Sequence, residues 1–206
     1  MNSPTHSLLA LALLSKQGET KRNWAVLIGS LFPDIVIYIW APYQRFIKGE
    51  SGARIWNELY FEAPMQDLIA VFNSIPIYAA IAVLGFAVMK KADAEAETTQ
   101  YGPLLLFFAL AALIHMTTDL PVHAHDAYRH FWPISDWRFY SPLSYYEAGK
   151  HSAWVSLFET ALALCSIFIL WRRFPKKWVR ITLGIFAAIY IGLNIILRLV
   201  PFHFPI

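Results

Sequence analysis

The sequence predicts an all-α, polytopic helical membrane protein that forms a single integral-membrane domain over residues 1–206. Hydrophobic residues make up 57% of the chain and charged residues only 15%, whereas an ordinary soluble domain carries about 25% charge. A water-soluble chain of this length could not bury so much apolar surface. The third observation is that long apolar runs recur along the chain, with basic residues in short clusters beside them.

Five runs are long enough to cross a bilayer as helices, which takes about 18 or more mostly apolar residues. They cover residues 24–41, 67–89, 102–120, 153–171 and 178–200. Tryptophan or tyrosine marks many of their ends, as expected where amphipathic rings meet lipid headgroups. The first apolar stretch is too short to span. Because Pro4 is typical of a first helical turn, we expect a short, half-inserted helix over 4–14.

The segments between these runs differ in length and in charge. The short ones, 16–23, 90–100 and 172–177, together hold nine Lys or Arg residues, while the long ones, 42–66 and 121–152, hold six. Basic residues concentrate on the cytoplasmic side of membrane proteins, so both long loops are expected on the outer side. The net charge of +3 is thereby explained by membrane topology, and no nucleic-acid partner is predicted.

Histidine and aspartate alternate near the end of the third run. His115, Asp119, His123, Asp126 and His130 are separated by 4, 4, 3 and 4 residues, which places all five on one face if the helix continues. Pro121 must kink that helix. Imidazole and carboxylate are the usual nitrogen and oxygen ligands of zinc, and they also suit manganese or iron. A divalent metal ion, with zinc as the leading choice, is therefore the predicted cofactor.

Two further acids lie within apolar runs, where a carboxylate costs about 2.5–3.5 kcal/mol on insertion scales. Asp34 follows Pro33, which interrupts the first run and frees backbone carbonyls around a site. Glu159 lies in the fourth run; it is either functional, or protonated, or bonded to a neighbouring hydroxyl. With the short segments inside, both acids fall at the depth of His115 and Asp119. His6 and His151 fall at that depth as well.

Three motifs stand in order along the chain: Pro4-Thr-His6-Ser, Gly29-Ser-Leu-Phe-Pro-Asp34 and His115-Met-Thr-Thr-Asp119. They resemble those of bacterial inner-membrane metal-dependent hydrolases, a family that is distantly similar to zinc-dependent phospholipase C. The resemblance spans nearly the whole chain and implies metal ligands at His6, Asp34, His115 and Asp119. The segment from His123 to Pro133 resembles one proteobacterial branch, and His123, Asp126, His130 and His151 match that branch's pattern. Val36 and Asn73 depart from the family pattern.

The interpretation that follows is a membrane-embedded hydrolase that acts on an ester or phosphoester of a lipid or lipid-linked substrate. Its expected place is the bacterial inner membrane, with the site facing the outer side. The expected metal ligands are His6, Asp34, His115, Asp119, His123 and His151, and Asp126, His130 and Glu159 are expected to assist catalysis. Two alternatives stay open: a non-catalytic scaffold or regulator with a structural metal site, and a transporter. The transporter is disfavoured by the lack of a second interrupted helix in the predicted set.

Overall fold

The computed structural model describes residues 1–94, 101–147 and 149–199, and it places side chains up to residue 92 in the first segment and up to residue 192 in the last. The described residues are mostly helical and include no strand, which confirms the predicted all-α class. The elements, in order, are α1 (Ser3–Leu14), α2 (Thr20–Leu31), η1 (Phe32–Asp34), α3 (Ile35–Pro42), η2 (Tyr43–Ile47), α4 (Gly52–Asn57), η3 (Leu59–Phe61), α5 (Ala63–Phe72), α6 (Ile75–Ala94), α7 (Tyr101–Asp119), η4 (Leu120–Val122), α8 (Ser152–Arg173) and α9 (Lys177–Leu199).

Among the described residues, four helical stretches are long and apolar enough to cross a membrane: Thr20–Ile47, Ala63–Ala92, Tyr101–Val122 and Ser152–Arg173. They contain the first four predicted spans, so a helical membrane protein is confirmed. The fifth predicted span, 178–200, coincides with α9 as far as Leu199; residue 200 lies outside the described residues. The predicted short helix is α1, which begins one residue earlier than expected.

Two of the four stretches are interrupted, and a proline explains each interruption. Pro33 has no backbone N–H, so the first stretch passes through the 3-10 turn η1 between α2 and α3. The predicted span 67–89 lies within the stretch Ala63–Ala92, but it contains an interruption that was not predicted: α5 ends at Phe72 and α6 begins at Ile75, with Pro76 in its first turn. The two interruptions touch, because Asn73 Nδ2 donates to Pro33 O at 3.0 Å. A second interrupted helix therefore exists, which removes one argument against a transporter.

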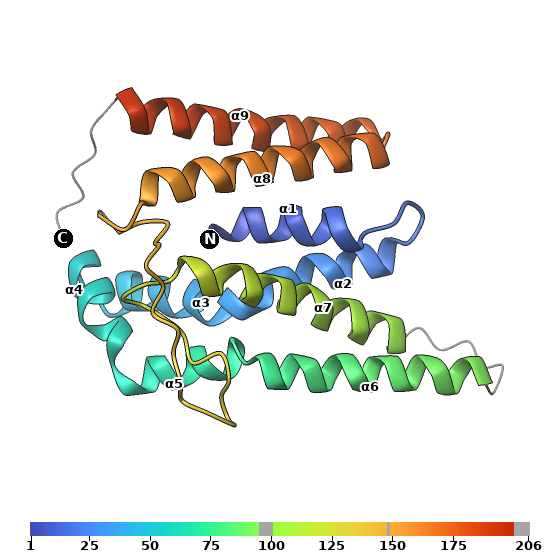
Figure 1. Cartoon of the computed structure of the whole chain (residues 1–206), viewed down its shortest axis with the longest axis horizontal. Coiled ribbons are helices and arrows are strands. Elements are labelled where there is room, and N and C mark those ends of the chain that lie inside the picture. The colour runs from blue at the N-terminus through green and yellow to red at the C-terminus, as the bar shows by residue number, and fades with distance from the viewer. Residues whose placement is uncertain (95–100, 148, 200–206) are drawn as a thin grey trace.

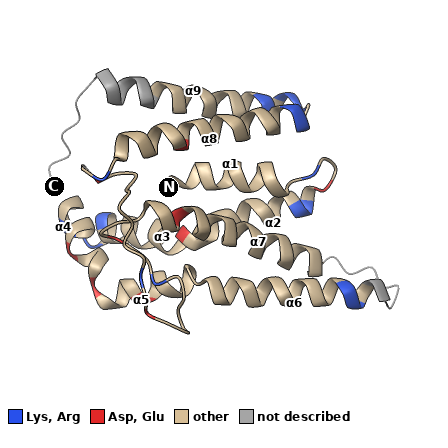
Figure 2. Ribbon diagram, in the orientation of Figure 1, with Lys and Arg blue, Asp and Glu red and all other residues tan. Residues whose placement is uncertain are grey.

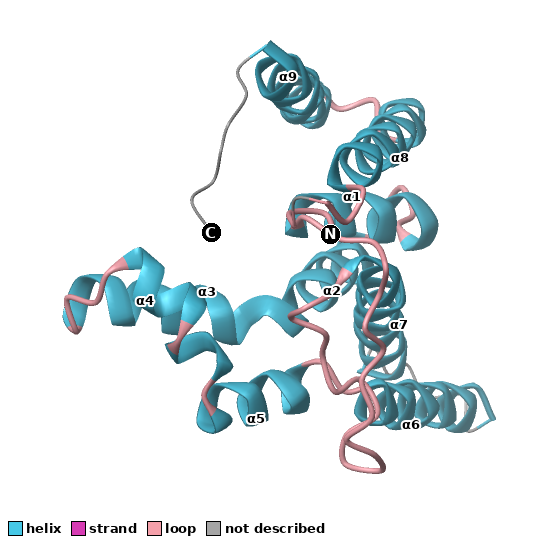
Figure 3. Cartoon of the chain, turned by 60° about the vertical axis from the view of Figure 1, so that its left-hand side comes forward, coloured by secondary structure: helices cyan, strands magenta, loops and turns pink. Residues whose placement is uncertain are grey.

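The long helices run side by side, with α7 packed between α2 and α6 (Figure 1). The short helix α1 lies among α2, α7 and α8, and α9 covers the outer side of α8. Seen from the side, α3, α4 and α5 extend away from the α2–α7 pair (Figure 3). The expected long loop 42–66 is largely helical, since it holds η2, α4 and η3.

Basic residues gather at one end of the bundle, around the α1–α2 connection, the end of α6 and the α8–α9 turn (Figure 2). Arg173 at that end donates to Leu11 O at 3.2 Å and to Ser15 O at 2.8 Å, so it caps the carboxyl end of α1. The irregular segments 123–147 and 149–151 lie toward the opposite end, which the amino end of α1 faces. The His/Asp residues lie toward this second end.

The predicted helical stripe holds only for its first pair. Helix α7 ends at Asp119, η4 follows, and His123 is in extended conformation with φ −104° and ψ 117°. Pro121 explains the ending, because it cannot donate to the turn before it. Asp126 and His130 therefore reach the centre of the protein from the irregular segment and not from a continued helix.

Candidate metal centre

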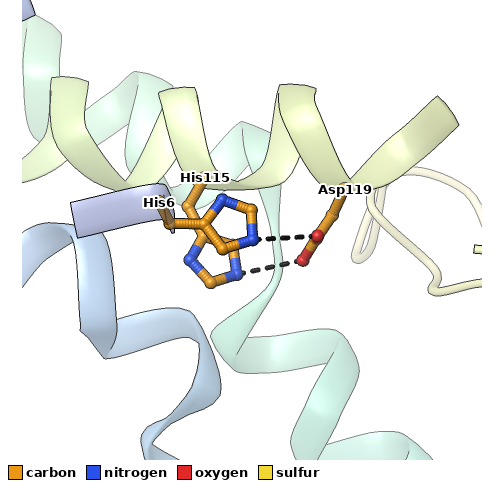
Figure 4. Close-up of side chains that lie close together, drawn as sticks. All are labelled: His6, His115 and Asp119. Atoms are coloured by element: carbon orange, nitrogen blue, oxygen red, sulfur yellow. Dashed lines mark hydrogen bonds and ion pairs between the residues drawn. The ribbon is translucent and has the colours of Figure 1, made fainter. Parts of the chain in front are cut away.

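The last turn of α7 carries the core of the site. His115 and Asp119 are one turn apart, and His115 Nε2 lies 3.0 Å from Asp119 Oδ2. His6 comes from α1, where its Nε2 lies 2.9 Å from Asp119 Oδ1. The two imidazoles stack with ring centroids 3.7 Å apart, and both present Nε2 to the same carboxylate (Figure 4). All three side chains are buried, with 3% exposure or less.

Each of these histidines has its outer ring nitrogen fixed by an acceptor. His115 Nδ1 donates to Ser30 O at 2.7 Å. His6 Nδ1 lies 3.0 Å from Thr118 Oγ1. The Thr118 hydroxyl donates its own proton to the carbonyls of Ile114 and His115, both at 2.9 Å, so it accepts from His6. With Nδ1 held in this way, Nε2 is the ring nitrogen that faces Asp119 in both residues: His115 Nε2 makes no hydrogen bond, and His6 Nε2 hydrogen-bonds to Asp119 Oδ1, where a bound ion would replace the proton. Fixing one nitrogen so that the other can bind an ion is the usual support of a metal-ligating histidine.

The second ring nitrogen of His115, Nε2, faces the carboxylates of Asp119 and Asp34. It makes no hydrogen bond, although it is fully buried. Asp119 Oδ2 is 3.0 Å away but out of line for a hydrogen bond, and Asp34 Oδ1 is 3.6 Å away. A lone pair that faces two carboxylates is repelled unless a proton or a cation lies between them. His6 Nε2, His115 Nε2 and an Asp119 oxygen lie within 4.8 Å of one another, which suits one bound ion.

Asp34 borders this group from η1. Ser3 Oγ donates to Asp34 Oδ2 at 2.5 Å, so α1 orients this carboxylate as well as supplying His6. The Asp34 side chain is 13% exposed, more than any of His6, His115 or Asp119. The group is therefore most accessible to solvent at Asp34.

His123 reaches the same carboxylate from beyond the end of α7. Its Nδ1 donates to Asp126 Oδ2 at 2.7 Å, and its Nε2 lies 3.4 Å from Asp119 Oδ1. Burial alone would lower the pKa of His123, but the carboxylates of Asp119 and Asp126 outweigh burial and raise it to about 9. Asp126 is thus the partner that orients His123, in the manner of a carboxylate behind a ligating histidine.

His130 lies against the interruption between α5 and α6. Its Nδ1 donates to Asn73 O at 3.0 Å, and its carbonyl accepts from Ile75 N at 2.8 Å. Its Nε2 is buried and makes no hydrogen bond. Burial lowers the pKa of His130, so this ring is neutral at pH 7.

Six of the predicted residues therefore gather: His6, Asp34, His115, Asp119, His123 and Asp126. Comparison with protein-family models, with curated proteins and with solved structures finds no match. The chemistry of the site is consequently inferred from its own geometry. Fixed imidazoles and buried carboxylates make up a donor set suited to a divalent ion, and the amino group of Met1, 2.5 Å from Asp119 Oδ1, is the cation nearest to that carboxylate.

Two predicted residues lie elsewhere. Glu159 on α8 accepts from Asn2 N at 2.8 Å and from Thr5 Oγ1 at 2.7 Å, so it holds the start of α1 and does not touch the His/Asp group. His151 is exposed just before α8, with a left-handed backbone at φ 58°. Its side chain makes no described hydrogen bond or ion pair to the site.

The sequence reading missed the supporting atoms. The carbonyls of Ser30 and Asn73 and the hydroxyls of Ser3 and Thr118 orient the functional side chains. The sequence does indicate that these two carbonyls are free. Each belongs to the residue three positions before a proline, which has no N–H to donate back to it in a 3-10 turn. No signal in the sequence pairs either carbonyl with a particular histidine.

Proposed function

We propose that this chain is an integral-membrane, metal-dependent hydrolase that cleaves an ester or phosphoester of a lipid or lipid-linked substrate. The supporting observation is the orientation of His115. Its Nδ1 donates to Ser30 O, so its Nε2 faces the carboxylates of Asp119 and Asp34 and makes no hydrogen bond. A divalent cation satisfies all three groups at once. Zinc is the favoured ion because imidazole nitrogen and carboxylate oxygen are its common ligands.

The roles of the side chains follow from their positions. His6, His115 and Asp119 would hold the ion, with Asp34 and His123 beside it. A bound divalent ion supplies an activated water and polarises the bond under attack. Asp34 faces the open side, so it would position the water or the substrate oxygen. Asp126 holds His123 through Nδ1, which leaves Nε2 as the atom that binds the ion or exchanges a proton with the substrate.

The surroundings of the site favour a lipid substrate. Helix α3 begins directly after Asp34 and has no buried side chain. Tyr38 and Ile39 on it are 49% and 66% exposed, and in a membrane such side chains face lipid. A substrate that arrives within the bilayer would therefore meet Asp34 first. Because basic residues collect at the other end of the bundle, the site is expected at the outer side of the membrane (Figure 2). The motifs that resemble inner-membrane hydrolases support a bacterial inner membrane.

The test compares two substitutions at His115. An asparagine carries an N–H near the position of Nδ1 and can still donate to Ser30 O, but it offers nothing at Nε2; a glutamine reaches toward Nε2 instead. Protein purified in mild detergent should contain bound zinc or another divalent ion, measured by plasma mass spectrometry. We expect His115→Asn to remove the ion and all turnover of ester, phosphodiester and phospholipid substrates. His115→Gln should retain part of the metal.

The control is His125→Ala, because His125 is exposed and lies outside the His/Asp group. It should keep both metal and turnover. Wild-type protein that takes up no ion under any loading condition, or a His125→Ala variant as damaged as His115→Asn, would contradict the proposal.

One observation favours a second candidate, a non-catalytic membrane protein with a structural metal site. His6, His115 and Asp119 are almost completely enclosed, and closed sites are typical of structural ions. In that case the ion is retained, chelation lowers the melting temperature, and no ester or phosphoester is turned over. The exposure of Asp34 favours the enzyme instead.

A further inference from the structure

Two buried acceptor atoms lie beside the centre described above without a donor. They are His130 Nε2 and Asn73 Oδ1, and neither makes a hydrogen bond. Both residues are buried, with 4% exposure for His130 and 0% for Asn73. Buried polar atoms in folded proteins nearly always have partners, so two neighbouring exceptions need an explanation.

The hydrogen bonds around these residues show that both free atoms are acceptors. His130 Nδ1 must donate to Asn73 O, since a carbonyl can only accept, and Nε2 therefore carries a lone pair. Asn73 Nδ2 likewise donates to Pro33 O at 3.0 Å, which leaves the amide oxygen free. Asp34, a carboxylate, directly follows the Pro33 that Asn73 contacts. The region contains an excess of acceptors, which a cation satisfies.

We propose that His130 Nε2 and Asn73 Oδ1 bind a second divalent transition-metal ion, next to the ion of the His6–His115–Asp119 group. This inference rests on the proposed function, because it assumes that the first ion is bound. Asp34 links the two positions: its Oδ1 lies 3.6 Å from His115 Nε2, and its chain neighbour Pro33 bonds to Asn73. Imidazole nitrogen with amide and carboxylate oxygen suits zinc, manganese or iron.

The surroundings of His115 and those of His130 share one local arrangement. Pro33 removes a backbone donor, and the carbonyl three residues earlier, Ser30 O, accepts from His115 Nδ1 at 2.7 Å. Pro76 does the same, and the carbonyl three residues earlier, Asn73 O, accepts from His130 Nδ1 at 3.0 Å. In both rings the other nitrogen, Nε2, is buried and without a hydrogen bond. In both places, a carbonyl three residues before a proline fixes Nδ1 of a histidine and leaves its Nε2 available to a metal ion.

The experiment counts ions. Full-length protein in mild detergent is loaded with Zn²⁺, freed of excess metal by gel filtration, and analysed for zinc per chain by plasma mass spectrometry. We expect two ions in the wild type and one in His130→Asn, which keeps a side-chain donor for Asn73 O and deletes Nε2. Asn73→Leu should also bind one ion. Asn73→Asp, which retains a ligating oxygen, should bind two, as should the control His125→Ala.

A second measurement does not depend on any variant. Wild type loaded with Mn²⁺ should give the electron paramagnetic resonance signal of a spin-coupled pair, because two ions that share Asp34 must be close neighbours. An isolated six-line signal from stoichiometric Mn²⁺ would overturn the inference.

The outcomes separate this inference from the proposed function. A single zinc ion that is lost in His115→Asn and unaffected by His130→Asn leaves the first centre standing and overturns the second. A wild type without any bound ion contradicts the proposed function itself. Loss of one ion from both His130→Asn and Asn73→Leu, with recovery in Asn73→Asp, supports the second ion, since a merely structural role of Asn73 gives no such recovery.

Discussion

Helices α2 and α7 touch at Gly29, and a single methyl group there is predicted to damage both the fold and the metal centre. A Cβ built on Gly29 would lie 2.1 Å from Phe108 O and 2.8 Å from Phe108 C. Both are backbone atoms of α7, so no side-chain rotation relieves the clash. Small residues that let helix backbones approach closely are common in membrane bundles.

The size of the effect follows from the geometry. Ordinary van der Waals contact begins at 3.4 Å, so Gly29→Ala requires the two backbones to separate by about 1.3 Å. The next residue, Ser30, holds His115 through the 2.7 Å hydrogen bond at its carbonyl. Separation by that amount lengthens this bond to as much as about 4 Å, beyond the 3.2 Å limit of a normal bond. Overpacking of this kind costs about 3 kcal/mol, which lowers the melting temperature by roughly 6–12 °C for a chain of this length.

The assay measures melting temperature and bound metal on the same detergent-purified samples. Gly184→Ala is the matched control: Gly184 also lies in a long helix, but its added Cβ meets only the Trp171 ring edge at 3.9 Å. Because alanine is favoured over glycine in helices by about 1 kcal/mol, this control should melt at the same temperature or slightly higher. A Gly29→Ala variant that melts like wild type and keeps its metal would refute the packing argument and the dependence of His115 on Ser30.

Replacing Glu159 by alanine should lower the melting temperature and the metal content, because it leaves the backbone N–H of Asn2 without an acceptor at a cost of about 1–3 kcal/mol and removes one of the two partners of Thr5 Oγ1. Glu159→Gln should recover most of both properties, and equal behaviour of the two variants would argue that Glu159 does not hold the start of α1. Metal affinity, measured by titration calorimetry, should rise about tenfold per pH unit up to about pH 9. The reason is that His123, whose pKa is raised to about 9, must lose a proton before it binds an ion. An affinity that does not change between pH 6 and 8.5 excludes His123 as a ligand. Reporter fusions after Lys91 and Lys177 should lie in the cytoplasm and those within 50–62 on the opposite side, and the inverse pattern would move the site to the cytoplasmic face.

The helical class and the positions of the long helices could be predicted from the sequence because they depend on apolar run length alone. The interruption within 67–89 was not predicted, because Asn73, Ser74 and Pro76 do not lower the local hydropathy enough to end an apolar run. Turn chemistry, and not hydropathy, decides that break. Pro33 stands beside an acid and was read correctly as an interruption.

The pairing of the site residues could be predicted only where they share a helix. His115 and Asp119 are one turn apart, so their proximity follows from helical geometry. His123 and Asp126 continue the same spacing in the sequence, yet they reach the site through an extended backbone after α7 has ended. They lie near Asp119, as the spacing suggested, but only because the segment after α7 turns back toward the end of that helix. Helical periodicity does not predict this turn.

An acid within an apolar helix indicates that its carboxylate has a partner, but it does not indicate which partner. Asp34, Asp119 and Glu159 each lie where an unpaired carboxylate is costly, and the sequence treats them alike. The structure opposes Asp34 with Nε2 of His115, and Asp119 with Nε2 of both His115 and His6, an arrangement that suits a bound cation. It opposes Glu159 with the first backbone N–H and a hydroxyl of α1, whose positive dipole end offsets the charge without an ion. The donor that faces each carboxylate, and not its depth in the membrane, separates a residue of the metal centre from one that anchors the helix carrying His6.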